Sequence, residues 1–135
     1  MNELAKCACG ALQVRITADP VHLVACHCTD CQGRTGSAYG VSCIVEDRAF
    51  EHICGDVSQY KRLGDTGGWV LNNFCPTCGT SVFWTAEVIP GLVAVAGGSF
   101  ENTDWIDLKT HIYTRSAQKW MTYPSDCTKL EGFSE

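Results

Sequence analysis

The sequence of 135 residues lacks long apolar runs. No stretch approaches the ~18 consecutive apolar residues that identify a membrane-spanning helix, so we expect no membrane partner. The segment from Met1 to Lys6 has neither the basic residues nor the apolar core of a secretory signal. These absences predict a cytoplasmic protein in a reducing compartment, where cysteines remain thiols or bind metal.

Positive charge is also scarce. Ten Lys and Arg residues stand against fifteen Asp and Glu residues, which gives a formal net charge of -5 at pH 7 with neutral histidines. The basic residues form no block along the chain. Because proteins that bind nucleic acids or anionic membranes need basic surfaces, the composition argues against both as partners.

Helical periodicity is weak throughout, whereas patterns typical of strands recur at short intervals. We therefore predict one mainly β domain over residues 1–135, with little helix. The only short helix that we expect falls within 29–37, and the tail after Tyr123 should be irregular. Strands are predicted at 12–18, at 41–45, in a hairpin of 69–74 with 81–85, at 92–96 as a strand buried on both faces, and at 111–114.

Cysteine, by contrast, is abundant, with ten residues. Seven of the ten lie in three groups: C-A-C-G at 7–10, C-H-C-T-D-C at 26–31 and C-P-T-C-G at 75–79.

The third group is the most specific. Two residues separate Cys75 from Cys78, which allows both sulfurs to bind one metal ion at ~2.3 Å. Pro76 favours the turn, and Gly79 permits a positive φ at its exit. A redox pair usually opens a helix, but a strand-like run follows here, so we favour zinc over a redox pair or a disulfide.

A structural zinc site needs four ligands, and the first group supplies a natural complement. The glycine after Cys9 repeats the glycine after Cys78. We predict that Cys7, Cys9, Cys75 and Cys78 hold one structural zinc ion. The alternative is that Cys7 and Cys9 are buried strand residues.

The second group offers three thiols, Cys26, Cys28 and Cys31, within six residues. Three protein ligands and one open position are typical of catalytic zinc, whereas a distant fourth ligand such as Cys43, Cys54 or His111 would close the site. Zinc with three thiolates is a poor Lewis acid, but it suits a sulfur as its fourth ligand. A substrate thiol bound there would be deprotonated, so the residues indicate chemistry on a thiol or thioether.

The three groups, in this order, resemble the glutathione-dependent formaldehyde-activating enzyme family, which also contains centromere protein V. The resemblance covers about residues 7–120 and includes the stretches 93–98 and 111–113. It implies a β-tent fold, an open sandwich of antiparallel sheets with two zinc ions. By motif match, Cys7, Cys9, Cys75 and Cys78 bind the structural zinc, and Cys26, Cys28 and Cys31 bind the catalytic zinc.

The named activity of the family adds glutathione to formaldehyde and gives S-hydroxymethylglutathione, while other members are carbon–sulfur lyases. We therefore expect a small thiol or thioether substrate such as a glutathione conjugate. Many members carry a basic residue directly after the third cysteine of the second group, whereas here Gln32 and Gly33 precede Arg34. Arg34 is the predicted substrate-binding residue, since an arginine can pair with a glutathione carboxylate.

His27 and Asp30 are the predicted proton-transfer residues. The side chain of His27 should point away from the metal bound by its neighbours, so a hydrogen-bonded structural role is the alternative. Asp30 is equally suited to cap the turn. Three aromatic residues are expected in the core: Trp69, Phe83 and Trp84.

Two other functions compete with the enzyme. One is a non-catalytic zinc-binding interaction domain. The other is a redox enzyme like the B-type methionine sulfoxide reductases, in which Cys127 would be the nucleophile; no histidine or basic residue adjoins Cys127, so this reading ranks last. An open second metal site in a cleft would favour the enzyme.

Overall fold

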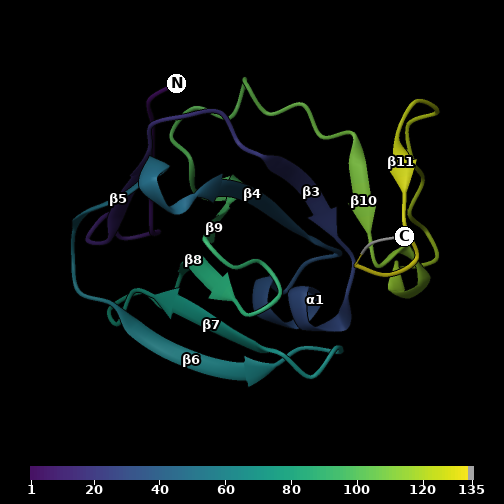
Figure 1. The fold of residues 1–135 in the computed structure, drawn as a ribbon, viewed down its shortest axis with the longest axis horizontal. Helices are drawn as coiled ribbons and strands as arrows, with labels where there is room; N and C mark the ends of the chain where they lie inside the picture. Colours follow the sequence, from purple (N-terminus) through teal and green to yellow (C-terminus); the bar gives the residue numbers. More distant parts are fainter. Residues whose placement is uncertain (134–135) are drawn as a thin grey trace.

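The computed structural model describes residues 1–133, in which short strands follow one another along most of the chain (Figure 1). These residues form eleven strands, one α-helix and three 3-10 helices: β1 (Glu3–Lys6), β2 (Gln13–Ile16), β3 (His22–Cys26), α1 (Thr29–Thr35), β4 (Gly40–Glu46), η1 (Asp47–Ala49), β5 (Phe50–Cys54), β6 (Ser58–Leu63), β7 (Trp69–Phe74), β8 (Ser81–Ala86), β9 (Leu92–Ala96), η2 (Gly97–Ser99), β10 (Thr110–Ile112), η3 (Thr114–Ser116) and β11 (Thr128–Lys129).

The strands form two sheets. The small sheet has the order β1-β2-β5, and the long sheet has the order β11-β10-β3-β4-β9-β8-β7-β6. In Figure 1 the long sheet runs from β11 at the right to β6 at the bottom, and α1 is drawn between these two ends. Most neighbours are antiparallel, but β10 runs parallel to both β3 and β11.

The main hydrophobic core lies between the two sheets. Val14 and Ile16 of the small sheet pack into one cluster with Cys43, Val45 and Val95 of the long sheet. Successive residues of a strand point to opposite faces, so the residues between these core positions project from the other face of the long sheet. That second face carries the functional site.

Helix α1 covers part of this second face. It begins after Cys28, whose sulfur accepts a hydrogen bond of 3.2 Å from the backbone N–H of Cys31. It ends at Gly36, which has a left-handed backbone with φ 67°. No helix among residues 1–133 is both long enough and apolar enough to cross a membrane.

The predicted fold class, a mainly β and open arrangement with little helix, is confirmed. The strands predicted at 69–74 and 92–96 match β7 and β9. The strands β1, β3, β5 and β6 were not predicted. Because β5 and β6 are largely exposed edge strands, they lack a clear alternation of buried and exposed residues.

Two expectations were wrong. The tail after Tyr123 is not wholly irregular, because β11 pairs there with β10. The sandwich is also not fully antiparallel, since the chain crosses from β9 to the far side of β3 before it forms β10.

Candidate active site

Four of the predicted metal ligands come together where the two sheets meet. Cys7 and Cys9 follow β1, and Cys75 and Cys78 form the turn between β7 and β8. Their four sulfurs all lie within 4.8 Å of one another, with 3.6 Å between Cys7 and Cys9 and 3.7 Å between Cys9 and Cys75. Tetrahedral zinc with bonds of ~2.3 Å separates its sulfurs by about 3.8 Å, so this four-cysteine cluster fits a zinc ion.

Polar hydrogens around the four-cysteine cluster lower the pKa of Cys75 and Cys78, whereas the pKa of Cys9 is raised to about 11, because the hydrogen bond from the backbone of Ala11 is outweighed by the Cys7 thiol and burial. The backbone N–H of Leu12 donates to Cys7 Sγ at 3.2 Å, and that of Thr77 donates to Cys75 Sγ at 3.4 Å. The Thr80 hydroxyl lies 3.3 Å from Cys78 Sγ, and this hydrogen bond is the main reason that the pKa of Cys78 falls to about 5. A thiolate is the form that binds metal.

The chain leaves each of the two cysteine turns through a glycine with a left-handed backbone, as the sequence suggested for Gly79. Gly10 has φ 82° and Gly79 has φ 80°. A side chain at either position would strain this backbone. The two turns therefore share the geometry of their exit, although one residue separates the cysteines of the first turn and two separate those of the second.

The other three predicted ligands form a second group, the three-cysteine cluster. Cys26 ends β3, Cys28 caps α1 and Cys31 lies in the first turn of α1. Their sulfurs lie within 4.8 Å of one another, and no other His, Cys, Asp or Glu ligand atom among residues 1–133 joins the group. The thiols of Cys26 and then Cys31 hydrogen-bond Cys28 and lower its pKa. The arrangement offers a metal three sulfurs and an open position.

The three alternative fourth ligands lie elsewhere. Cys43 is fully buried in the core between the sheets, where burial raises the pKa of its thiol to about 12. Cys54 is exposed at the end of β5. His111 hydrogen-bonds His27 instead, with 2.9 Å between its Nδ1 and Nε2 of His27.

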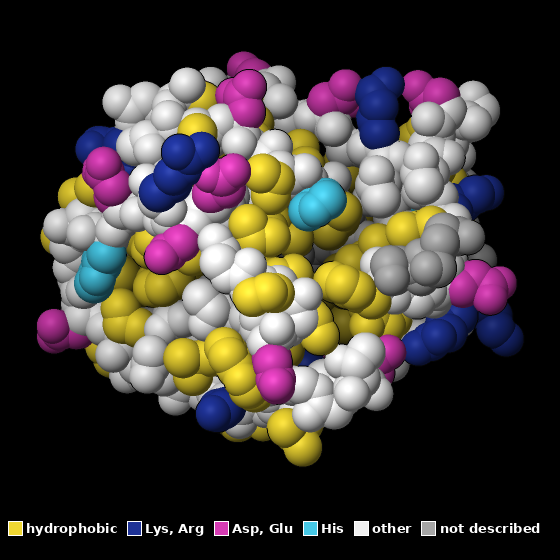
Figure 2. Space-filling view, in the orientation of Figure 1, with side chains coloured by type: hydrophobic (Ala, Val, Ile, Leu, Met, Phe, Trp, Pro, Cys, Tyr) yellow, Lys and Arg dark blue, Asp and Glu magenta, His cyan; other side chains and the backbone are white. Residues whose placement is uncertain are grey.

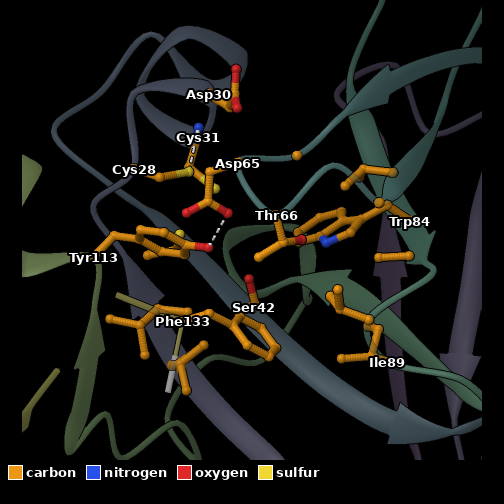
Figure 3. Close-up of a pocket in the computed structure, with 18 of the residues that line it drawn as sticks. Cys28, Asp30, Cys31, Ser42, Asp65, Thr66, Trp84, Ile89, Tyr113 and Phe133 are labelled. Atoms are coloured by element: carbon orange, nitrogen blue, oxygen red, sulfur yellow. Dashed lines mark hydrogen bonds between the residues drawn. The ribbon is translucent and has the colours of Figure 1, made fainter. Parts of the chain in front are cut away.

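The three-cysteine cluster borders a cavity of about 220 Å³ on the second face of the long sheet. Figure 2 shows hydrophobic side chains gathered around a hollow in the middle of this face. The walls are strands β3, β4, β7, β8 and β10, the start of α1, and the loop between β6 and β7. In Figure 3, Cys28 and Cys31 lie at one end of the cavity, and Trp84, Ile89 and Phe133 line its other sides.

Charged groups at the cavity occur as pairs. The Tyr113 hydroxyl donates to Asp65 Oδ1 at 2.7 Å, and Arg115 lies 3.2 Å from the other carboxylate oxygen of Asp65. Arg62 lies 3.1 Å from the Asp30 carboxylate. Figure 3 shows the Asp65 carboxylate directed toward Tyr113 beside the three-cysteine cluster. Asp65 and Tyr113 thus bring a carboxylate and a hydroxyl to the end of the cavity next to the three-cysteine cluster.

Residues 3–116 match the family described as glutathione-dependent formaldehyde-activating enzyme. The chain belongs to this family. The matched range contains all seven clustered cysteines and most of the residues that line the cavity.

A crystal structure of a Rhodobacter sphaeroides protein has the same fold. The two chains are 18% identical with a TM-score of 0.60, and the alignment covers 76% of this chain and 91% of that one. No curated protein sequence matches the chain significantly.

The three other predicted site residues lie in different surroundings. His27 is fully buried, and its ring stacks on His111 at 5.2 Å between centroids, away from the cavity lining. Asp30 lines the cavity, paired with Arg62. Arg34 belongs to the last turn of α1, with its guanidinium carbon 4.3 Å from the centre of the Trp84 ring, and it is not among the lining residues described. Their catalytic and binding roles stay predictions.

Several cavity residues escaped the sequence reasoning. Trp69 and Trp84 line the cavity, although Trp84 also belongs to a buried core cluster with Ile44 and Ala94, as expected. Phe83 packs against the main core. Tyr113 and Asp65 were not singled out. Asp65 lies in a glycine-rich turn, but nothing in the sequence shows that this turn reaches β10.

Proposed function

We propose that this protein is a zinc-dependent enzyme that forms or cleaves a carbon–sulfur bond in a small thiol or thioether, such as a glutathione conjugate. One observation carries the proposal: the three-cysteine cluster borders a cavity and has no fourth ligand within reach among residues 1–133. A structural site would be closed by four protein ligands, as the four-cysteine cluster is. The family match supports the same class of substrate.

Each cluster has a separate task in this proposal. Cys7, Cys9, Cys75 and Cys78 would hold a structural zinc ion, and Cys26, Cys28 and Cys31 would hold a catalytic one. Zinc bound to three thiolates would supply a fourth position that keeps a substrate sulfur ionised.

The reaction balances as an addition to a carbonyl and its reverse. In the forward direction the sulfur forms a bond to the carbonyl carbon, and the electron pair of the carbonyl double bond moves to oxygen. That oxygen takes up the proton that the thiol released. The lyase direction runs the same steps backwards. Addition of glutathione to formaldehyde, with S-hydroxymethylglutathione as the product, is one instance.

The proton can be carried by the Tyr113 and Asp65 pair. Their hydrogen bond lies at the metal-binding end of the cavity, and Arg115 holds the second oxygen of Asp65. Asp65 would accept the thiol proton, and the Tyr113 hydroxyl would donate toward the oxygen of the carbon partner.

Asp30, paired with Arg62, would orient the substrate at the mouth. His27, hydrogen-bonded to His111 behind the three-cysteine cluster, would support the loop that carries the cysteines.

Cobalt substitution tests the proposal directly. The protein should bind two cobalt ions, and added glutathione should strengthen the thiolate-to-cobalt charge-transfer bands of one of them. Cys28→Ser should abolish this response, whereas Cys54→Ser, at an exposed cysteine outside both clusters, should preserve it. If glutathione and simpler thiols all leave the spectrum unchanged, the second site is structural, and a zinc-binding interaction domain is the better reading.

A further inference from the structure

The cavity beside the three-cysteine cluster is larger than a one-carbon substituent requires. Its volume is about 220 Å³, whereas an apolar cavity of about 150 Å³ already admits a benzene ring. Hydroxymethyl, the group that formaldehyde contributes to a thiol, would leave most of this space unfilled. The size therefore points to a bulkier group on the sulfur.

The register of the long sheet makes the floor of the cavity apolar. Ile44, Ala94 and Trp84 stand in one row across β4, β9 and β8, and they form one buried cluster. In the next row on β8, Ala86 pairs with Val70 of β7, and both line the cavity. A ligand on this floor would meet hydrocarbon and an indole ring, which suits an apolar group.

The ring of Trp84, which forms an aromatic wall of the cavity, is held in place by Arg34. The guanidinium of Arg34 stacks on one face of the Trp84 ring, with its carbon atom 4.3 Å from the ring centre. A Cβ atom at position 40 would lie 2.5 Å from Nη2 of Arg34, so Gly40 makes this close approach possible. Trp84 is therefore a fixed surface for a ring to stack on.

The charges at the cavity leave little to attract a second polar group. Its two lining cations, Arg62 and Arg115, are already paired with Asp30 and Asp65. Ser42 of β4, labelled in Figure 3, adds a hydroxyl to the apolar floor. The charged part of a peptide-like thiol would therefore lie at the exposed mouth, where its carboxylate would exchange with Asp30 for Arg62.

Resting on the proposed function, we infer that the natural substrate carries on its sulfur an apolar substituent of about the size of an aromatic ring. This substituent lies against Trp84 and Ile44, while the sulfur meets the three-cysteine cluster. The substrate class is the adduct of a small charged thiol with an aryl or bulky alkyl aldehyde, which the proposed addition forms and its reverse cleaves. Formaldehyde, which lacks any apolar group, is then not the preferred carbon partner.

Binding of two matched probes, S-benzylglutathione and S-methylglutathione, to the zinc-loaded protein tests this inference. Quenching of tryptophan fluorescence and calorimetry report binding without turnover. We expect the benzyl thioether to bind at least tenfold more tightly than the methyl thioether. Equal affinities would overturn the inference.

Two variants locate the bound ring. Ala86→Leu fills the floor and should weaken the benzyl probe at least tenfold while it changes the methyl probe little. Val88→Asp places a charge on the cavity wall and should act likewise; Val21→Asp is its control, because the two valines are 43% and 44% exposed and only Val88 lines the cavity. Unchanged benzyl affinity in folded samples of both variants would contradict the inference.

The outcome separates this inference from the proposed function. A cobalt spectrum that responds to thiols, together with equal affinity for both probes, overturns only the apolar substituent. A cobalt spectrum that no thiol perturbs overturns the proposed function and the substrate class together. A response to thiols with a tenfold preference for the benzyl probe supports both.

Discussion

Tyr113 joins two distant segments by donating a hydrogen bond of 2.7 Å to Asp65. Tyr113 follows β10, whereas Asp65 lies in the loop between β6 and β7. The backbone of Tyr113 is left-handed with φ 55°, a conformation that costs a bulky residue on the order of 1–3 kcal/mol. Such strain persists where the surroundings enforce it, and here it aims the hydroxyl at the loop beside the three-cysteine cluster.

The first prediction concerns this pair. Tyr113→Phe removes the hydroxyl, and Asp65→Asn keeps an acceptor for it but removes the charge. We expect each to lower kcat about a hundredfold, since general acid–base groups contribute roughly 10² to 10⁴. The melting temperature should change little, because one hydrogen bond contributes only about 1 kcal/mol net. Steady-state kinetics and thermal melts measure both effects.

A matched control is Asp126→Asn, because Asp126 is an exposed acid paired with Lys109 outside the cavity. This variant should retain its activity. Values of kcat within threefold of the parent for both Tyr113→Phe and Asp65→Asn would remove the pair from catalysis.

The second prediction concerns the four-cysteine cluster. Cys75→Ser should lose one equivalent of zinc and destabilise the fold severely, because structural zinc contributes on the order of 10 kcal/mol in small zinc modules. Elemental analysis and thermal unfolding measure the two effects. Cys54→Ser should match the parent in both. A soluble Cys75→Ser protein with full metal content and a normal melting temperature is the result that this prediction forbids.

The third prediction concerns the three-cysteine cluster. Cys28→Ser should lower the metal content from two equivalents to one and reduce activity at least a hundredfold. It should cost far less stability than Cys75→Ser, because all three cysteines come from one short segment and close no long loop. A Cys28→Ser protein as unstable as Cys75→Ser would mean that the second metal is structural.

The sequence predicted the metal clusters better than the cavity, for a physical reason. Ligand spacing is local, so the turn of Cys75 and Cys78 and the segment of Cys26 to Cys31 could be read directly. The cavity is made by side chains of strands that pair far apart in the chain. Whether the side chain of Trp84 lies on the cavity face of the long sheet depends on the register in which β8 pairs with β7 and β9, and composition does not reveal that register.

His27 shows the same limit of prediction from sequence: local spacing is informative, but a partner from a distant strand is not. The sequence showed that its ring should point away from the metal, because it alternates with two ligands. Its partner His111 comes from β10, which reaches β3 through a parallel crossover that was not predicted. The hydrogen bond between the two rings could not be foreseen without this pairing.

The fourth prediction concerns Arg34, which the sequence suggested as a carboxylate-binding residue. Its guanidinium stacks on Trp84, and its Nη2 atom is buried without a hydrogen-bond partner among the residues described. We expect Arg34→Ala to reduce the free energy of unfolding by about 1–2 kcal/mol, as a partly buried cation–π contact would. The KM for a glutathione conjugate should change less than twofold. A large rise in KM with unchanged kcat would support carboxylate binding instead.

If the four-cysteine cluster binds zinc as proposed, it also sets an order of events during synthesis. Cys9 and Cys75 are 66 positions apart, so the first turn leaves the ribosome long before its metal-binding partner exists. Until the turn of Cys75 and Cys78 has emerged, the nascent strands β1 and β2 can pair only with each other and with β5, and no metal ion can link them to the long sheet. A cell short of zinc would accumulate chains with a loose N-terminal sheet, which proteases cut readily. The amount of this protein should then follow zinc supply even where its transcript does not.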